Sequence, residues 1–476
     1  MFRNLIQRDF RKVGIVIGLL HIHAHKMTNE KSFGNSVVER KESRKDDERS
    51  PSRKFLFVSD VGLIGDLAYQ VRNEGNEVRY CIRSKTDKDV SDGFVEKTDD
   101  WESLKDWAEV IVFDDIGFGS IAERLRREGK AVIGGTATSD RLELDRDFGQ
   151  EQLRKAGLLT IPSWDFNTFD DAINFVKNNP GRYVVKPSGK AQDDKVLSFI
   201  GQEEDGLDVL AVLDRYKNAW STKIKSFQIQ RFVSGVEVAV GAFFNGENFI
   251  LPVCINFEHK RMFSGEIGPS TGEMGTLMFW SERSRLYEET LVKFRPILAE
   301  MGFVGYFDIN CIANSRGIYP LEITPRFGYP TISIQMEGIT SKWGDFLYAL
   351  ANKQQFALRA QRGFQIGVVV AVPPYPFSDP AAYRRYSEDA VIIFKKAMSS
   401  GIHHGDAKLV NGDWRLAGSS GYALVVTGSG PTVEDARRET YNRVRNVIIP
   451  NLFYRTDIGE RWYKDTDLLL AWGYLS

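Results

Sequence analysis

The chain has 476 residues, enough for about two to four domains that each bury their own core. Its 63 lysines and arginines are nearly balanced by 64 aspartates and glutamates, which gives a formal net charge of -1. This balance lacks the positive field typical of proteins that bind nucleic acid or anionic membranes, so it favours small-molecule substrates without nucleic-acid or membrane partners.

The three cysteines, Cys81, Cys254 and Cys311, are widely separated and show neither CxxC nor metal-finger spacing. Such spacing gives no disulfide framework and is typical of a reducing compartment. We therefore expect a cytoplasmic protein whose cysteines are buried thiols.

The first 53 residues are predicted to form a disordered extension. Basic residues precede the apolar run VGIVIGLL, but this run is shorter than the roughly 20 residues that cross a bilayer. The polar segment HIHAHK follows it, where a signal peptide has a small-residue cleavage site. The segment from Met27 to Arg53 is dense in mixed charge and cannot offset the entropy of ordering. Met27 is an alternative to Met1 as the first residue.

Residues 54–147 alternate apolar strands with helices, as a small parallel α/β sheet does. The strands are KFLFVSD, AEVIVFDD and AVIGG, and the helices include LAYQVRNEG and IAERLRREG. Ligands of such sheets lie beyond the carboxyl ends of the strands. Asp114 and Asp115 end one strand, so they are candidates either for ligand contacts or for ordinary turn and helix-capping roles.

Residues 148–360 form a second predicted domain, built mainly from antiparallel strands. The segments YVVKP, QIQRFVSG, VEVAVGAFFNG and FILPV have the composition of strands, and glycines divide them. A helix is predicted from Ser284 to about Met301, followed by the strands GYFDINCIA and GIYPLEIT around the turn NSRG. A third, small α+β domain is predicted for residues 361–476, from strand QIGVVVAVP to helix TVEDARRETYNRVRNVI.

Asp308 and Glu322 lie on two adjacent predicted strands joined by a tight turn, so both carboxylates can point to one face. Thr324 follows Glu322 by two residues and therefore points to the same side of its strand. Facing oxygen ligands suit a hard divalent cation such as Mg²⁺, which completes its shell with nucleotide phosphates. The alternative is that these are solvated strand carboxylates.

Three further features are compatible with nucleotide binding. Lys186 ends the strand YVVK, where a lysine can reach a phosphate, and Glu237 can accept hydrogen bonds from the hydroxyls of a ribose. The loop from Ser264 to Thr276 has four glycines, which suits a mobile cover whose amides approach phosphates. Taken singly, the charges are ordinary surface residues and the loop is a flexible hairpin.

In chain order these pieces are a strand lysine, a strand glutamate, a glycine-rich loop and two acidic strands. This order resembles the ATP-grasp superfamily, and within it the phosphoribosylamine-glycine ligase family. The segment HKRMFSGEIGPSTGEMGT is similar to the family's HKR…GPNTGGMG, and LEITPRFGYPT is similar to its EFNARFGDPE. The segments IHHGDAKL, GYALVVTGSGPTVEDAR and LFYRTDIG also resemble family segments in the same order, so the resemblance covers roughly residues 54–465.

The resemblance implies a multidomain α/β and α+β fold in which residues 148–360 are an ATP-grasp domain with two antiparallel-sheet subdomains. ATP would be clamped between them, with Lys186 on its phosphates and Glu237 on its ribose. The adenine would meet the backbone of a four-residue strand end: Gln230, Arg231, Phe232 and Val233.

The same resemblance implies that Asp308, Glu322 and Thr324 hold Mg²⁺, or Mn²⁺, against the β- and γ-phosphates. Arg326 would neutralise the acyl phosphate or the acceptor carboxylate. A structural ion pair is the alternative for this arginine. The glycine-rich loop would close over the reacting groups and exclude water through four residues: Gly268, Thr271, Gly272 and Gly275.

The implied activity is ligation of glycine to 5-phosphoribosylamine, with ATP converted to ADP and phosphate, as in purine biosynthesis. The carboxylate of glycine would attack the γ-phosphate, and the substrate amine would consume the resulting acyl phosphate. Such phosphoryl transfer depends more on positioning and charge neutralisation than on a dedicated base.

Several residues differ from the family's motifs. Asp193 and Asp194 in KAQDDKV replace a glycine and a lysine of LAAGKGV, which predicts weaker nucleotide affinity. In the covering loop, Glu273 replaces a glycine. The N-terminal DVGLIGDLA stands where the family has GxGGREHAL, and it adds Asp60 and Asp66 where an anionic sugar phosphate favours basic groups.

These differences keep two alternatives open. One is a ligase of the same chemistry with a different amine or amino acid, and the other is a catalytically degenerate nucleotide-binding protein. The joint presence of Lys186, Glu237, Asp308, Glu322 and Arg326 favours an enzyme, because a chain without catalytic function has no physical reason to keep clustered charge.

Overall fold

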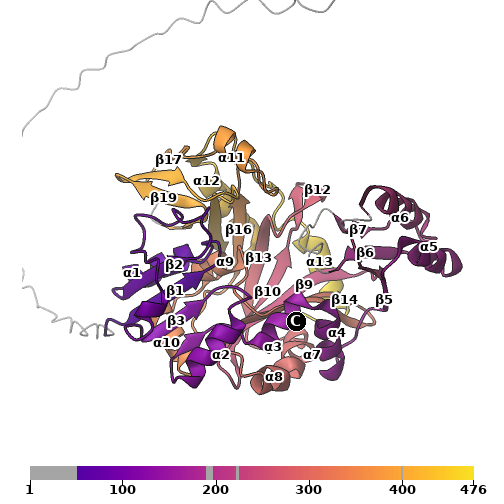
Figure 1. Ribbon diagram of the computed structural model, residues 1–476, viewed down its shortest axis with the longest axis horizontal. Coiled ribbons are helices and arrows are strands. Elements are labelled where there is room, and N and C mark those ends of the chain that lie inside the picture. The colour runs from indigo at the N-terminus through magenta and orange to yellow at the C-terminus, as the bar shows by residue number, and fades with distance from the viewer. Residues whose placement is uncertain (1–50, 189–196, 221–223, 398–399, 476) are drawn as a thin grey trace, which may run out of the picture. The chain divides into compact units, whose positions relative to one another are not determined.

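The computed structural model describes residues 51–188, 197–220, 224–397 and 400–475 (Figure 1). Most of the predicted extension lies outside these ranges, and so do Asp193 and Asp194. Residues 50–476 form one unit by their contacts. Within the described ranges, no helix is both long and apolar enough to cross a bilayer. The three cysteines are buried free thiols, as predicted.

The N-terminal sheet has four parallel strands in the order β2-β1-β3-β4. Its strands are β1 (Lys54–Ser59), β2 (Glu77–Ile82), β3 (Val110–Phe113) and β4 (Val132–Ile133). Its helices are α1 (Gly65–Asn73), α2 (Gly119–Arg127) and α3 (Ala137–Leu144), with a 3-10 turn at Glu102–Leu104. Strands β1 and β3 are buried almost throughout, which is why they are continuous apolar runs. The predicted small parallel sheet is confirmed.

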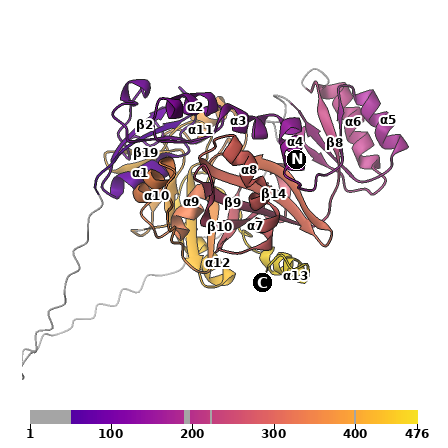
Figure 2. The ribbon, with the colours of Figure 1, turned by 90° about the horizontal axis from the view of Figure 1, so that it is seen from below.

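A second four-stranded sheet, in the order β5-β8-β6-β7, is antiparallel and has its own apolar core. Its strands are β5 (Ser163–Phe166), β6 (Tyr183–Pro187), β7 (Phe199–Ile200) and β8 (Phe227–Arg231). Helix α4 (Arg146–Lys155) precedes it, and α5 (Phe169–Asn178) and α6 (Leu207–Trp220) lie side by side against it (Figure 2). This sheet positions the predicted phosphate lysine and the predicted adenine strand.

The largest sheet is antiparallel and has eight strands in the order β15-β14-β9-β10-β13-β16-β21-β18. The strands are β9 (Val236–Phe244), β10 (Phe249–Glu258), β13 (Gly275–Ser281), β14 (Gly305–Asn314), β15 (Gly317–Thr324), β16 (Phe364–Val370), β18 (Ile402–His404) and β21 (Leu424–Gly430). Pairing of β13 with β16 carries the sheet across the predicted boundary at residue 361. The C-terminal region therefore extends the same sheet and shares its core.

The remaining strands form a two-stranded hairpin and a small four-stranded sheet in the order β19-β20-β17-β22. The hairpin is β11 (Arg261–Phe263) with β12 (Ile267–Ser270), and the small sheet contains β17 (Val391–Phe394), β19 (Ala407–Val410), β20 (Asp413–Leu416) and β22 (Val447–Ile448). The later helices are α9 (Thr331–Gly338), α10 (Trp343–Ala351), α11 (Pro380–Tyr386), α12 (Val433–Val444) and α13 (Trp462–Ala471).

The single helix predicted from Ser284 to about Met301 is wrong, because the structure has two. They are α7 (Arg285–Glu289) and α8 (Leu291–Glu300). Thr290 leaves the helical conformation, with φ of -123° and ψ of -85°, and its hydroxyl donates a hydrogen bond to the carbonyl of Leu286. A threonine hydroxyl that bonds to the carbonyl four residues earlier weakens and bends a helix, which is consistent with the break at this position.

Candidate active site

One face of β14 and β15 carries the predicted metal ligands. Asp308 is directly opposite Thr324, and Asn310 is directly opposite Glu322. Because successive side chains alternate between the faces of a strand, all four point to the same side of the sheet. Asp308 and Glu322 therefore share a face, as the sequence predicts, but they are diagonal neighbours, and the residue beside Glu322 is Asn310.

Lys260 forms ion pairs with three carboxylates from three strands. Its ammonium nitrogen is 3.0 Å from Oε1 of Glu237, 3.4 Å from Oε2 of Glu258 and 2.8 Å from Oε1 of Glu322. Burial lowers the pKa of Lys260, but the three glutamates outweigh it and hold the pKa well above its ordinary value. Sequence reasoning missed this residue, although it lies in the HKR segment that carries the family resemblance.

Lys186 on β6 belongs to the same site. Burial lowers its pKa to about 8, helped by the positive charge of Arg146, while the charges of Glu322 and Glu237 act in the opposite direction. These electrostatic effects require the lysine to lie near both glutamates. The side chain of Arg146 donates to the carbonyl of Pro187 at 3.2 Å, so a second cation that the sequence did not indicate stands beside Lys186.

The predicted adenine strand is β8 and the residues after it. Gln230 is buried and pairs with Val184 of β6 and Ser163 of β5. Arg231 stacks on the ring of Tyr183 at 4.7 Å, and Arg182 stacks on the ring of Phe232 at 3.5 Å. Because these side chains pack within their own subdomain, any adenine contact would be made by the backbone. Val233, the last residue of the predicted group, is half-buried.

The glycine-rich loop forms the β11–β12 hairpin and the turn after it. Gly268 lies in β12 with φ of +84°. The backbone N–H and the hydroxyl of Thr271 both donate to the carbonyl of Lys260, at 2.7 Å and 2.9 Å. Gly272 is exposed, and a Cβ atom added there would meet nothing within 4 Å. A Cβ added at Gly268 would meet the side chain of Phe263 at 2.7 Å, and one added at Gly275 would lie 2.6 Å from the backbone carbonyl oxygen of Gly367 on β16.

Arg326 is held by two carboxylates of the N-terminal region. Its guanidinium is 3.1 Å from Asp115 and 2.9 Å from Glu143, and it also donates to the carbonyl of Phe327. Burial lowers the pKa of Arg326, but the charges of Glu143 and Asp115 raise it above the ordinary arginine value. This geometry matches the structural ion pair that is the alternative role of Arg326. A role of Arg326 at the acyl phosphate stays a prediction.

Asp114 directly follows β3 and accepts hydrogen bonds from two hydroxyl groups. The hydroxyls of Ser59 and Tyr329 donate to its Oδ2, at 2.5 Å and 3.1 Å. Burial and the neighbouring charge of Asp115 raise the pKa of Asp114 to about 7. The carboxyl ends of β1 and β3 therefore carry a buried acid whose neutral form is favoured by burial.

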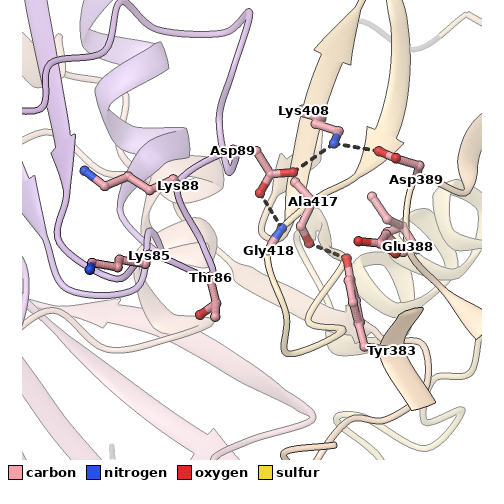
Figure 3. A pocket seen from close by; sticks show the side chains of 11 residues that line it. Lys85, Thr86, Lys88, Asp89, Tyr383, Glu388, Asp389, Lys408, Ala417 and Gly418 are labelled. Atoms are coloured by element: carbon pink, nitrogen blue, oxygen red, sulfur yellow. Dashed lines mark hydrogen bonds and ion pairs between the residues drawn. The ribbon is translucent and has the colours of Figure 1, made fainter. Parts of the chain in front are cut away.

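A cavity of about 260 Å³ lies elsewhere, between the segment after β2 and the small C-terminal sheet (Figure 3). Lys408 in its wall is 2.8 Å from Asp89 and 2.6 Å from Asp389, so its charge is already neutralised (Figure 3). The hydroxyl of Tyr383 donates to the carbonyl of Ala417. None of the predicted site residues lines this cavity.

The donor set at β14 and β15 fits magnesium. Carboxylate and hydroxyl oxygens of Glu322, Thr324 and Asp308 are the hard ligands that Mg²⁺ takes together with nucleotide phosphates. The described part of the chain contains no group of three or more His, Cys, Asp or Glu side chains that could hold a metal ion by themselves. A cation at this position would therefore take most of its ligands from the nucleotide and water.

Comparison with known proteins gives two family matches. The ATP-grasp (A) domain of phosphoribosylglycinamide synthetase matches residues 144–331, and the C domain of the same synthetase matches residues 365–461. Two relatives are the phosphoribosylamine-glycine ligases of Streptococcus suis and Listeria innocua, each 25% identical. The first match covers 74% of this chain and 83% of the relative, and the second covers 87% and 97%.

Solved structures show the same fold. The phosphoribosylamine-glycine ligase of Thermotoga maritima has a TM-score of 0.64 and 20% identity, and the match covers 85% of this chain and all 100% of that one. The biotin carboxylase domain of Hydrogenobacter thermophilus 2-oxoglutarate carboxylase has a TM-score of 0.60 and 13% identity. This match covers 90% of this chain and 100% of the biotin carboxylase chain.

The lysine on the four-stranded antiparallel sheet, the carboxylates on the eight-stranded sheet and the domain match over both define an ATP-grasp protein. Both domain matches come from one synthetase and together cover more than half of the chain. The chain belongs to the phosphoribosylglycinamide synthetase family.

Proposed function

We propose that this protein is an ATP-dependent ligase that joins the carboxylate of glycine to the amine of 5-phosphoribosylamine, the reaction named by its relatives and used in purine biosynthesis. The observation that carries the proposal is the charge cluster of Lys260, whose ammonium nitrogen lies within 3.4 Å of Glu237, Glu258 and Glu322. The charges of Glu237 and Glu322 also act on the pKa of Lys186 on the other sheet. Such a cluster suits a triphosphate and its cation. We further propose that the enzyme works in the cytoplasm.

In this proposal Lys186 holds the phosphates of ATP, and Glu237 accepts hydrogen bonds from the ribose. Glu322 and Thr324 hold magnesium, with Asp308 as the nearest carboxylate on the neighbouring strand. When bound, magnesium would neutralise negative charge on the phosphates of ATP. The backbone of Gln230, and of the three residues after it, borders the adenine.

The carboxylate of glycine attacks the γ-phosphorus, so that a carboxyl oxygen bonds to phosphorus and ADP leaves. The amine then attacks the carbonyl carbon of the acyl phosphate, inorganic phosphate leaves with the bonding electron pair, and the released phosphate takes up the proton that the amine nitrogen loses. Water would destroy this intermediate, so the β11–β12 hairpin, with Gly268, Thr271 and Gly272, is proposed to close over it. Arg326 is held by Asp115 and Glu143 of the N-terminal region, and we propose that from there it neutralises the acyl phosphate.

The test is ADP release from purified protein given ATP, Mg²⁺, glycine and 5-phosphoribosylamine. Replacing the proposed metal ligand, Glu322→Gln, is expected to lower kcat/KM by about 100-fold, as the loss of an electrostatic contact to the transferring phosphoryl group does. Glu300→Gln, at an exposed position on α8, is the matched control. ADP release that does not depend on glycine would contradict the proposal.

A second candidate is the same chemistry with an amine that lacks the sugar phosphate. It is favoured by the adjacent Asp114 and Asp115 after β3, because a phosphate bound there would meet the charge of Asp115 and could approach the buried Asp114 only in its neutral form. Stimulation of ADP release by simple amines, with none by 5-phosphoribosylamine, would support this candidate and exclude the first.

A further inference from the structure

Buried acceptor atoms without donors lie on the site face of the large sheet. In the residues that the structure describes, Oδ1 of Asn256, Oδ1 of Asn310 and Oε1 of Glu273 are buried and have no hydrogen-bond partner. Asn256 and Asn310 are 0% and 2% exposed, and Glu273 is 7% exposed. An unpaired buried acceptor costs about 1–3 kcal/mol, so three together indicate that a donor group belongs there.

The two asparagines are fixed beside carboxylates. Nδ2 of Asn256 donates to Oδ2 of Asp308 at 3.3 Å, and Nδ2 of Asn310 donates to Oε2 of Glu258 at 2.9 Å. Both asparagines are in register with Ala239 on the strand between them, whose side chain is a single methyl group. The amide oxygens and the carboxylates therefore gather around one small residue of β9.

Glu273 adds a third carboxylate from the turn that leads out of the covering hairpin. Hydrogen bonds on both sides of Glu273 hold this turn against the residues after Glu258: the N–H of Thr271 donates to the carbonyl of Lys260 at 2.7 Å, and the N–H of Met274 donates to the carbonyl of His259 at 2.8 Å. Burial and the negative charges of Glu258 and Asp308 raise the pKa of Glu273 well above its ordinary value. Lys260, 3.4 Å from Glu258, is the cation paired with this group, and it also neutralises two other glutamates. Buried carboxyls whose pKa is raised in this way favour their neutral forms, and a cation placed among them would favour the ionised forms.

We propose that Glu273 and Glu258, with the amide oxygens of Asn256 and Asn310, bind the ammonium group of the amino-acid substrate. A primary ammonium brings a positive charge and three N–H donors, which is what this group of acceptors lacks. The carboxylate of an α-amino acid is one carbon away from its nitrogen and would point outward to Lys260. Exposure increases in that direction, from 12% for the Glu258 side chain to 27% for Lys260.

This inference rests on the proposed ligase function and deepens it, because it restricts the carboxylate substrate to acids that carry an ammonium group. In the family resemblance a glycine stands in place of Glu273, so the carboxylate is a feature of this chain. The subsite should accept glycine and reject acetate, which has the carboxylate without the ammonium, and betaine, whose nitrogen has no N–H.

The experiment is calorimetric titration of the full chain with glycine, acetate and betaine in the presence of ADP and Mg²⁺. Glycine is expected to bind, and Glu273→Gln and Glu273→Gly are expected to weaken glycine binding about tenfold or more, the usual effect of removing a charge-assisted hydrogen bond. Nucleotide affinity should stay within about twofold of the unmodified protein. Glu300→Gln is the control, and an unchanged thermal midpoint establishes that each variant is folded.

Equal binding of glycine and acetate, or glycine binding that survives Glu273→Gln, overturns the inference. So does Mg²⁺ binding that depends on Glu273 without nucleotide, because it assigns the acceptors to a metal ion. Turnover is measured separately. If ADP release depends on glycine but Glu273→Gln leaves the KM for glycine unchanged, the inference is overturned. The ligase function stands in that case. Glycine binding that depends on Glu273, without any ADP release, supports the subsite and contradicts the function.

Discussion

Lys186 shows how position sets the chemistry of a single residue. It is half-buried on β6, and burial together with the positive charge of Arg146 lowers its pKa to about 8. A lysine in this range is close to losing its proton under mildly alkaline conditions, whereas an exposed lysine is not. Its ability to hold phosphate should therefore depend on pH.

We predict that the affinity for ATP falls as the pH rises above 8. The free protein then has a neutral Lys186, which must take up a proton to bind the phosphates, so affinity should fall by up to about tenfold per pH unit. Lys186→Arg keeps its charge in this range and should remove the pH dependence. Titration with a non-hydrolysable ATP analogue between pH 7 and pH 9 measures the effect.

The control for this prediction is Lys177→Arg, at an exposed lysine on α5 in the same subdomain. It should keep the pH profile of the unmodified protein. If the affinity of the unmodified protein is constant across this range, Lys186 does not hold the phosphates in the way proposed.

Among the elements, β13 connects the site to the C-terminal region. Gly275 begins this strand with φ of +150°, and its carbonyl accepts a hydrogen bond from the N–H of His259 at 2.9 Å. A Cβ atom there would lie 2.6 Å from the carbonyl oxygen of Gly367 and 2.9 Å from the side chain of Ile458. The glycine is thus explained by close packing between β13 and β16, and this contact sets the position of the turn that carries Glu273.

We predict that Gly275→Ala lowers the free energy of unfolding by about 2 kcal/mol or more, because the methyl group meets a backbone carbonyl that cannot move without disturbing the sheet. Gly272→Ala, three residues earlier, has open space around its Cβ position and should leave the stability unchanged. Urea unfolding of both variants compares them. Similar stabilities would show that β13 and β16 pack less closely than described.

At the scale of the whole molecule, a buried polar cluster connects the N-terminal helix α1 to β18. Oδ2 of Asp66 is 2.7 Å from Nδ1 of His403, and Oδ1 of Asp66 is 3.1 Å from Nδ1 of His404. His404 also contacts the hydroxyl of Ser91 at 3.0 Å, and His403 contacts that of Thr427 at 2.9 Å. The sequence suggested that Asp66 adds negative charge at a ligand site, but the structure pairs it with these histidines.

Burial alone would raise the pKa of Asp66, but His403 and His404 outweigh it and lower the pKa below its ordinary value of 3.8. A carboxyl whose pKa falls on folding stabilises the protein above its ordinary pKa, and this stabilisation is lost as the pH falls below it. We predict that Asp66→Asn lowers the free energy of unfolding at pH 7 by about 2 kcal/mol.

The difference between Asp66→Asn and the unmodified protein should shrink progressively below about pH 4, because the carboxyl then takes up a proton in the unfolded state while it is still ionised in the folded state. Thermal unfolding at a series of pH values measures it. Asp60→Asn, an exposed aspartate of the same segment, should behave like the unmodified protein throughout. A deficit in Asp66→Asn that persists at low pH would contradict the electrostatic explanation.

The sequence by itself determined the parallel N-terminal sheet, the antiparallel strands and the family, because alternating or continuous apolar runs and the order of short motifs are local properties. It also placed Glu322 and Thr324 on one side of a strand, since that follows from the period of two.

Only the tertiary structure decided which side chains meet. It placed Asn310 beside Glu322, joined Lys260 to three glutamates and paired Arg326 with Asp115 and Glu143. These contacts join strands and domains that are distant in the chain. Register between strands and the docking of separate sheets depend on packing over the whole core, and no local pattern encodes either of them.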